Sequence, residues 1–309
     1  MIKIAQLIKL LDYISRYETN PFHYPTQYIR LKQENWKKFI AAWEKEMEIE
    51  RKIAEEEEKK HRFSWIPFQK KEVEEEPVDV EPQKPLPQTR EQLIKYFLDE
   101  LYPFQLKWAS STISHVSYTD PKFNHDPTLK FFLQRFPDIY LLMYYPIFNI
   151  KKAPIEGEII LISPIDIEII VLIDDDPNAT IVASDDRTWV IETDDDSRKM
   201  ISPLISLKRT EQIVKSILNH HQVHFNIQKT VLSQTSQILY STEPYKTSLI
   251  GKREFDDWFE QKRNLSSPLK SEQLKAVEAL LMHCQTTSVR RPEWERDDDY
   301  LQMMIDEEL

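Results

Sequence analysis

Three consecutive carboxylates, Asp174, Asp175 and Asp176, give this sequence one possible metal-binding group. Carboxylate oxygens are the ligands that Mg²⁺ and Ca²⁺ prefer in proteins. Pro177 and Asn178 follow directly, and aspartates before such residues more often form a solvated turn. An EF-hand is excluded, because the run lacks the central glycine and the terminal glutamate of that calcium loop. The residues therefore leave two interpretations open, a metal site and a turn.

Imidazoles form a second group with possible metal chemistry. His220, His221 and His224 lie at the end of a segment with helical spacing, just before a predicted strand. Neutral imidazole nitrogen is a common metal ligand, but histidines also interact favourably with the carbonyl groups at a helix C-terminus. The second role is the commoner one, and the sequence does not decide between them.

A basic and aromatic segment near the N-terminus is a candidate for nucleic-acid binding. Cations beside aromatic rings can neutralise phosphates and stack on bases. The same spacing is more often the buried seam of a helical hairpin, so both interpretations stay open. The candidate residues are Arg30, Lys32, Trp36, Lys37 and Lys38.

Composition excludes several classes of protein. The formal charge of −11 argues against a chain that binds nucleic acid through its whole surface. Gly157 and Gly251 are the two glycines of the chain, so a glycine-rich phosphate loop cannot be formed and no nucleotide is expected as a ligand. Cys284 is the single cysteine and is expected to be a small buried hydrophobic residue. Without a signal peptide or a long apolar run, we expect a cytoplasmic protein with no membrane partner.

The chain is expected to divide into four parts. Residues 1–62 form a predicted helical N-terminal module, whose helices span Lys3–Tyr17 and Gln27–Lys60. Residues 63–90 are an acidic, proline-rich segment that we interpret as a poorly ordered linker. Residues 91–265 form the predicted α/β domain, and residues 266–309 a C-terminal helix and acidic tail.

The α/β domain is predicted to contain a helix, a strand, a strand hairpin, a small second hairpin, a helix and a strand in this order. Asp126 and Pro127 are typical of a helix start, as N-cap and first helical residue. The predicted elements are a helix at Pro127–Arg135, strands at Ile139–Ile150, Gly157–Ser163, Ile167–Ile173, Thr180–Ala183 and Thr188–Glu192, a helix at Pro203–His221, and a strand at Phe225–Leu232.

This order of elements resembles the nuclease-related domain (NERD) family over about residues 126 to 263. Trp189 and Ser202-Pro203-Leu204 match the frame of that family. The segments that carry the resemblance are TLKFFLQRFPDIYLLMYYPIF, GEIILISPIDIEIIVLID, SPLISLKRTEQIVKSIL and FNIQKTVLS. The resemblance implies an α/β (α+β) fold with a restriction-endonuclease-like core sheet flanked by helices.

The resemblance also implies where a catalytic centre would lie. Such a centre uses two carboxylates that hold a divalent metal, and a lysine that positions the attacking water. Glu158 replaces the aspartate of the family's second core strand. The family also has a Glu-x-Lys motif near the end of the third core strand. In this sequence the motif falls on residues 171–173 or, with the register moved forward, on residues 174–176, and neither set contains a lysine.

We therefore expect a catalytically inactive, nuclease-related domain that acts as a binding or scaffold protein. A protein partner is expected, nucleic acid is a possible partner, and no cofactor is expected. The alternatives are an accessory factor that binds nucleic acid and an active nuclease that depends on Mg²⁺ or Mn²⁺. In the nuclease, Glu158 with Asp174 or Asp176 would bind the metal and serve catalysis.

Overall fold

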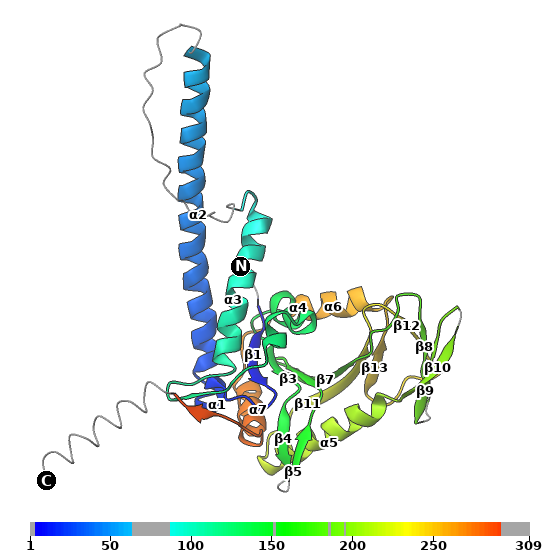
Figure 1. Cartoon of the computed structure of the whole chain (residues 1–309). Helices are drawn as coiled ribbons and strands as arrows, with labels where there is room; N and C mark the ends of the chain where they lie inside the picture. The colour runs from blue at the N-terminus through cyan, green and yellow to red at the C-terminus, as the bar shows by residue number, and fades with distance from the viewer. Residues whose placement is uncertain (1–3, 64–86, 151–152, 185–186, 195, 292–309) are drawn as a thin grey trace, which may run out of the picture. The chain divides into compact units, whose positions relative to one another are not determined.

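The computed structural model describes residues 4–63, 87–150, 153–184, 187–194 and 196–291 (Figure 1). The chain forms two compact units, of which one combines Met1–Tyr28 with Leu101–Leu309 and the other comprises Ile29–Glu100. Most of the predicted linker, from residue 64 to residue 86, lies outside the described residues.

A six-stranded mixed sheet forms the centre of the larger unit. Its middle strands are antiparallel neighbours, β3 with β6 and β6 with β7, while β1 pairs with β3 and β11 with both β7 and β13 in parallel. In spatial order the strands are β1 (Gln6–Leu10), β3 (Leu141–Tyr144), β6 (Ile159–Ile162), β7 (Asp166–Leu172), β11 (Asn226–Leu232) and β13 (Thr247–Ile250).

Helices lie against this sheet, as Figure 1 shows. They are α4 (Pro127–Arg135), α5 (Leu204–His220), α6 (Phe255–Arg263) and α7 (Ser271–Met282). Phe132 of α4 and Trp258 of α6 share a core with Leu161 and Ile170 of the sheet. The α5 helix instead contacts β7, β11 and α7. The protein is thus a mixed α/β structure with a multi-stranded sheet flanked by helices.

Several predicted elements are confirmed. Asp126 caps α4, since its Oδ1 accepts a hydrogen bond from the Leu129 amide at 2.9 Å. The hairpin of β6 and β7 closes over a short turn, where the Ser163 amide donates to the Asp166 carbonyl at 2.8 Å. The predicted helix ending at His221 is α5, which buries Leu207, Ile213, Val214, Ile217 and Leu218.

The predicted helix at Lys3–Tyr17 is wrong. Residues 6 to 10 form the edge strand β1, and a short helix, α1 (Arg16–Thr19), follows. Every residue from Ile4 to Leu10 is buried, including Gln6 and Lys9. The strand is covered on both faces, and its polar residues find partners inside the fold. The apolar residues of this segment are spaced as in an amphipathic helix, but they do not form one buried helix face, because the whole of β1 is buried.

The predicted strand at Ile139–Ile150 is two strands. Tyr145 has a positive φ of 47° and separates β3 from β4 (Ile147–Ile150). The β4 strand leaves the central sheet and pairs with β5 (Ala153–Glu156). Two further short pieces, β2 (His115–Val116) and β14 (Val289–Arg290), pair with each other, and a 3-10 turn, η1, spans Pro121–Asn124.

A second, four-stranded sheet contains the small hairpin that the sequence predicts. The β8 and β9 strands are antiparallel, and Trp189 of β9 is fully buried. A Cβ atom at Gly251 would lie 2.6 Å from the Ile238 amide nitrogen, so this close approach to β12 requires glycine. In spatial order the strands are β10 (Ser197–Ile201), β9 (Thr188–Glu192), β8 (Thr180–Val182) and β12 (Gln237–Leu239).

The unit Ile29–Glu100 takes its helices from α2 (Tyr24–Phe63) and α3 (Arg90–Trp108). Aromatic rings join the two helices, with Trp36 5.0 Å from Phe97 and Phe39 stacked on Tyr96 at 5.6 Å between ring centroids. Trp36, the aromatic residue of the candidate segment, thus packs between two helices, as the helical-hairpin interpretation expects. Of the helices in the described part of the chain, none is long and apolar enough to cross a membrane.

Candidate functional site

Two carboxylates of the central sheet lie on opposite faces. Successive side chains of a strand point to alternate faces. Glu168 of β7 pairs with Leu161 of β6 and contacts α6, whereas Glu158, just before β6, lies at a position of the other parity and contacts α5. These two acids therefore cannot bind one metal ion together.

Glu158 is half-buried against α5. Its amide donates to Thr210 Oγ1 at 3.2 Å. Burial raises the pKa of the Glu158 carboxyl, and a hydrogen bond with Ser206 and the charge of Arg209 partly offset that rise. The side chain of this predicted metal ligand thus interacts with α5.

The aspartates after β7 organise a loop. Asp174 Oδ1 accepts a hydrogen bond from the Gln234 amide at 2.7 Å, which joins this segment to the residues after β11. Asp176 Oδ1 accepts from the Asn178 amide at 2.8 Å, as in an Asx turn, and Asp175 forms an ion pair with Arg198. These contacts support the turn interpretation of the three aspartates.

Glu168, which sequence analysis did not select, is the centre of a buried polar group. Its Oε1 accepts hydrogen bonds from Thr230 Oγ1 and, at 3.0 Å, from Trp258 Nε1. Its Oε2 lies 2.6 Å from Lys262 Nζ, and the side chains of the glutamate and the lysine are 4% and 15% exposed. This carboxylate has an internal counter-ion, which suits a structural role better than binding of a hydrated metal ion.

The basic and aromatic candidates do not form one surface. Lys32 is buried at 2% exposure, and one side of Trp36 contacts Phe97. Arg30, Lys37 and Lys38 are exposed, and Arg30 lies 3.7 Å from Glu34. Three of the five residues are therefore exposed enough to reach a phosphate, while the expected stacking residue is occupied within the hairpin.

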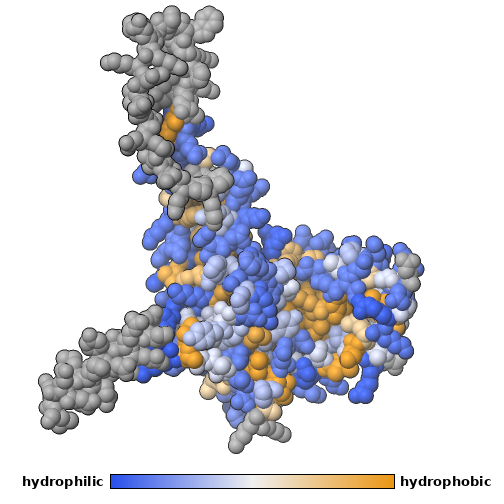
Figure 2. All heavy atoms as spheres, viewed as in Figure 1, coloured by the Kyte–Doolittle hydropathy of each residue, from blue (hydrophilic) through white to orange (hydrophobic). Residues whose placement is uncertain are grey.

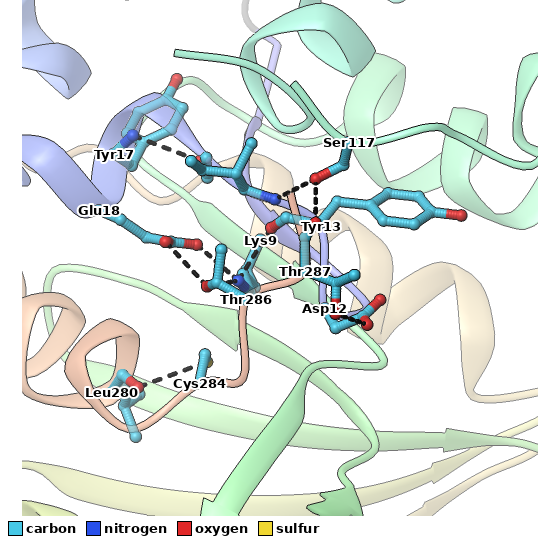
Figure 3. Close-up of polar contacts among 12 residues, drawn as sticks. Lys9, Asp12, Tyr13, Tyr17, Glu18, Ser117, Leu280, Cys284, Thr286 and Thr287 are labelled. Atoms are coloured by element: carbon cyan, nitrogen blue, oxygen red, sulfur yellow. Dashed lines mark hydrogen bonds and ion pairs between the residues drawn. The ribbon is translucent and has the colours of Figure 1, made fainter. Parts of the chain in front are cut away.

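A fully buried lysine is the centre of another polar group, shown in Figure 3. Lys9 Nζ donates to Glu18 Oε1 at 2.5 Å, to the Tyr13 carbonyl at 2.9 Å and to Thr286 Oγ1 at 3.0 Å. An ammonium group has three donors, and all three are used. We name Lys9, Tyr13, Glu18 and Thr286 the lysine cluster.

Cys284 lies close to the lysine cluster. Its Sγ is 3.4 Å from the Leu280 carbonyl, and burial raises the pKa of the thiol to about 12. The thiolate is the reactive form, so this cysteine is unreactive at neutral pH. Cys284 is half-buried, so the expectation of a small buried residue is met in part.

The structure gives the histidines a different grouping from the one the sequence indicates. His220 and His221 come together with His283, which follows α7, and one ligand nitrogen from each lies within 4.8 Å of the other two. His224 is exposed and is not part of this group. We name His220, His221 and His283 the histidine cluster. Among the described residues, these are the three side chains with possible metal-ligand atoms that lie within 4.8 Å of one another.

A surface pocket is lined by side chains that suit an anion rather than a metal ion. Two cationic side chains, Lys107 and Arg291, line it together with hydroxyl and apolar side chains. Such a lining suits a small anion, although Ser111 and Ser117 donate to backbone carbonyls of the protein itself. The remaining lining residues are Pro103, Leu106, Ser110, Val116, Thr119 and Asn124.

Comparisons with known proteins reach only part of this chain. It is 51% identical over 47 residues to an RNA 2′,3′-cyclic phosphodiesterase of Geobacillus stearothermophilus. The similarity covers 15% of this chain and 15% of that protein. No protein-family model matches the chain, and no solved structure matches it significantly. A likeness of this length does not establish a family.

Two features of these groups could not be selected from the sequence. Glu168 is an acid in the apolar run of β7, and its partners Trp258 and Lys262 follow about 90 residues later, in α6. His283 is isolated in the sequence from His220 and His221, and only the packing of α5 on α7 brings the three together. Trp258 and Lys262 are four residues apart and so share one face of α6. This was the one sequence signal that linked Lys262 to Trp258.

Proposed function

We propose that this chain is a binding or scaffold protein whose nuclease-like order of elements carries no working nuclease centre. The observation that carries the proposal is the separation of its acids: Glu158 faces α5, while Glu168 faces α6 on the other side of the sheet. A metal-dependent nuclease needs two carboxylates that converge on one ion. The order α4, β3, β6, β7, α5, β11 supports the resemblance to the nuclease-related domain family and its restriction-endonuclease-like core.

The two predicted metal-binding aspartates after β7 give the same indication. Asp174 and Asp176 accept hydrogen bonds from nearby backbone amides, and these bonds hold the loop after β7. The chemistry of the loop therefore favours a structural role.

A cleavage assay tests this proposal. We expect the purified chain to leave linear DNA, supercoiled DNA and RNA intact with Mg²⁺ and with Mn²⁺, which tolerates imperfect geometry. Cleavage that disappears in a folded Glu158→Ala variant would replace the proposal with a metal-dependent nuclease. Asp257→Ala in α6 is the matched control, because that acid lies in the helix that contacts Glu168 instead.

The helical hairpin supports a protein as the partner. Ile49 and Ile53 of α2 are 48% and 52% exposed and lie four residues apart, on one face of the helix. Their neighbours are charged, and Figure 2 shows mostly hydrophilic residues over the visible surface of α2. An apolar stripe of this kind can dock in a groove of a partner protein.

Quantitative affinity purification from the source cells tests the role of this stripe. Proteins enriched with the natural chain should be lost with an Ile49→Glu/Ile53→Glu double variant. The matched control, Glu46→Lys/Glu50→Lys, changes charge at other exposed positions of α2 and should keep them. Equal enrichment by the natural chain and the isoleucine variant would show that this stripe does not bind the partner.

A further inference from the structure

The histidine cluster forms where two helices end. His220 is the last residue of α5, His221 is the C-cap of that helix, and His283 is the C-cap of α7. His221 Nε2 lies 3.0 Å from His283 Nε2, and the three rings pack edge to face with centroids 5.1 to 5.9 Å apart. Three nitrogen donors therefore converge from two separate parts of the sequence.

The spacing of these nitrogens is close to that of a metal site. With Zn–N bonds of about 2.0–2.1 Å in a tetrahedron, two ligand nitrogens lie about 3.3 Å apart. The 3.0 Å between His221 and His283 is near that value, and a ligand nitrogen of His220 is within 4.8 Å of both. A small rotation of the His220 side chain would complete the three contacts.

The electrostatic surroundings also favour a cation. The carbonyl end of a helix carries about half a negative charge. Both α5 and α7 direct this end toward the cluster, because each of them ends at one of its histidines.

Hydrogen bonds hold the backbone of two of the histidines in place. The His283 amide donates to the Leu280 carbonyl at 3.1 Å, and its carbonyl accepts from the Asn149 amide of β4 at 2.8 Å. The His221 amide donates to the Ile217 carbonyl at 3.1 Å. Because these hydrogen bonds already order the backbone, the chain would lose less conformational entropy when it binds an ion.

We propose that His220, His221 and His283 form a binding site for a divalent transition metal, with Zn²⁺ as the preferred ion. Imidazole nitrogen suits zinc better than Mg²⁺ or Ca²⁺, which select oxygen ligands. Three protein ligands leave the fourth position of a tetrahedron for water or an external ligand, and exposure of His220 gives that position access to solvent. A metal-free hydrogen bond between two neutral imidazoles is the alternative explanation of the 3.0 Å contact.

Metal titration of the full chain, prepared without a histidine tag and stripped with a chelator, tests the proposal. Isothermal titration with Zn²⁺ should give one equivalent of tight binding, and Co²⁺ should give the visible absorption of a four-coordinate site. The variants His220→Gln and His283→Gln should each lower zinc affinity by more than about 100-fold, because loss of an outer-shell partner alone costs 10–100-fold. His224→Gln is the matched control and should bind as the natural chain does.

Three results would overturn the proposal: no zinc uptake by the natural chain, unchanged affinity in the two ligand variants, or an equal loss in His224→Gln. Circular dichroism of each variant checks that it folds. His220 is exposed, so its replacement disturbs packing little, and this variant decides the outcome if His283→Gln does not fold. The proposal does not depend on the proposed binding function, because neither cleavage nor partner binding enters the assay.

Discussion

The lysine cluster and the histidine cluster both join segments that are far apart in the sequence, but they differ in composition. In the lysine cluster a cation meets a carboxylate, a carbonyl and a hydroxyl, and every ammonium donor has its acceptor. The histidine cluster brings together three groups of one kind, each able to offer a lone pair. The first cluster is complete within the chain, whereas the second has the chemistry of a group that an added cation would complete.

The largest effect is expected from Lys9→Met, which keeps an unbranched side chain but removes the buried charge. The lysine side chain is 0% exposed and that of Glu18 is 19% exposed, so the carboxylate would lose its buried counter-ion. Removing one partner of such a pair destabilises by about 3–5 kcal/mol. Urea unfolding should show this decrease in the free energy of unfolding. Lys52→Met is the control, because its pair with Glu48 is exposed, and should leave the midpoint unchanged.

A smaller effect is expected when both charges of the lysine cluster are removed. The double variant Lys9→Met/Glu18→Leu should recover much of the stability that Lys9→Met loses, since apolar replacement of a whole buried pair is often nearly neutral. A double variant less stable than Lys9→Met would show that Glu18 stabilises the fold without the lysine, through contacts such as the hydrogen bond that its Oε2 accepts from Thr286 Oγ1 at 3.0 Å.

The smallest effect is expected when the pH is lowered, and it depends on the histidine cluster. The pKa of His283 is lowered in the folded protein by burial and by His221 and His220, while the unfolded chain titrates near about 6.5. Between the folded pKa and this value the unfolded state binds more protons, so stability rises with pH. We therefore expect the free energy of unfolding to decrease modestly as pH falls below about 6.5. The same series with His283→Gln should show a weaker dependence, and an identical slope in both proteins would contradict the assignment.

Local signals predicted much of the larger unit. The aspartate cap at Asp126, the two short apolar runs of the β6–β7 hairpin and the apolar face of α5 each depend on neighbours in the sequence, and each was found as expected. The strand β1 was missed because its residues are buried on both sides, so the period of two that identifies a strand is absent. Its buried Lys9 looked like the polar face of a helix.

The candidate site was harder to predict for a related reason. The resemblance to the nuclease-related family placed Glu158 with Asp174 or Asp176, but strand parity and loop hydrogen bonds decide which way such acids face. The histidine cluster needed the packing of α5 against α7. Contacts between elements separated by about 60 residues, such as His221 with His283, have no local signature.

The position of β1 has a consequence for how this protein is made. Gln6 of β1 pairs with Leu141 of β3, and the strand has no other partner in the six-stranded sheet. During synthesis, β1 therefore leaves the ribosome long before the residues of β3 with which it pairs. The nascent chain must carry an apolar strand without its sheet until β3 emerges, and a chain that lost β1 would expose the edge of β3 to pairing with other molecules. The central sheet therefore cannot be completed at its β1 edge until β3 has been synthesised.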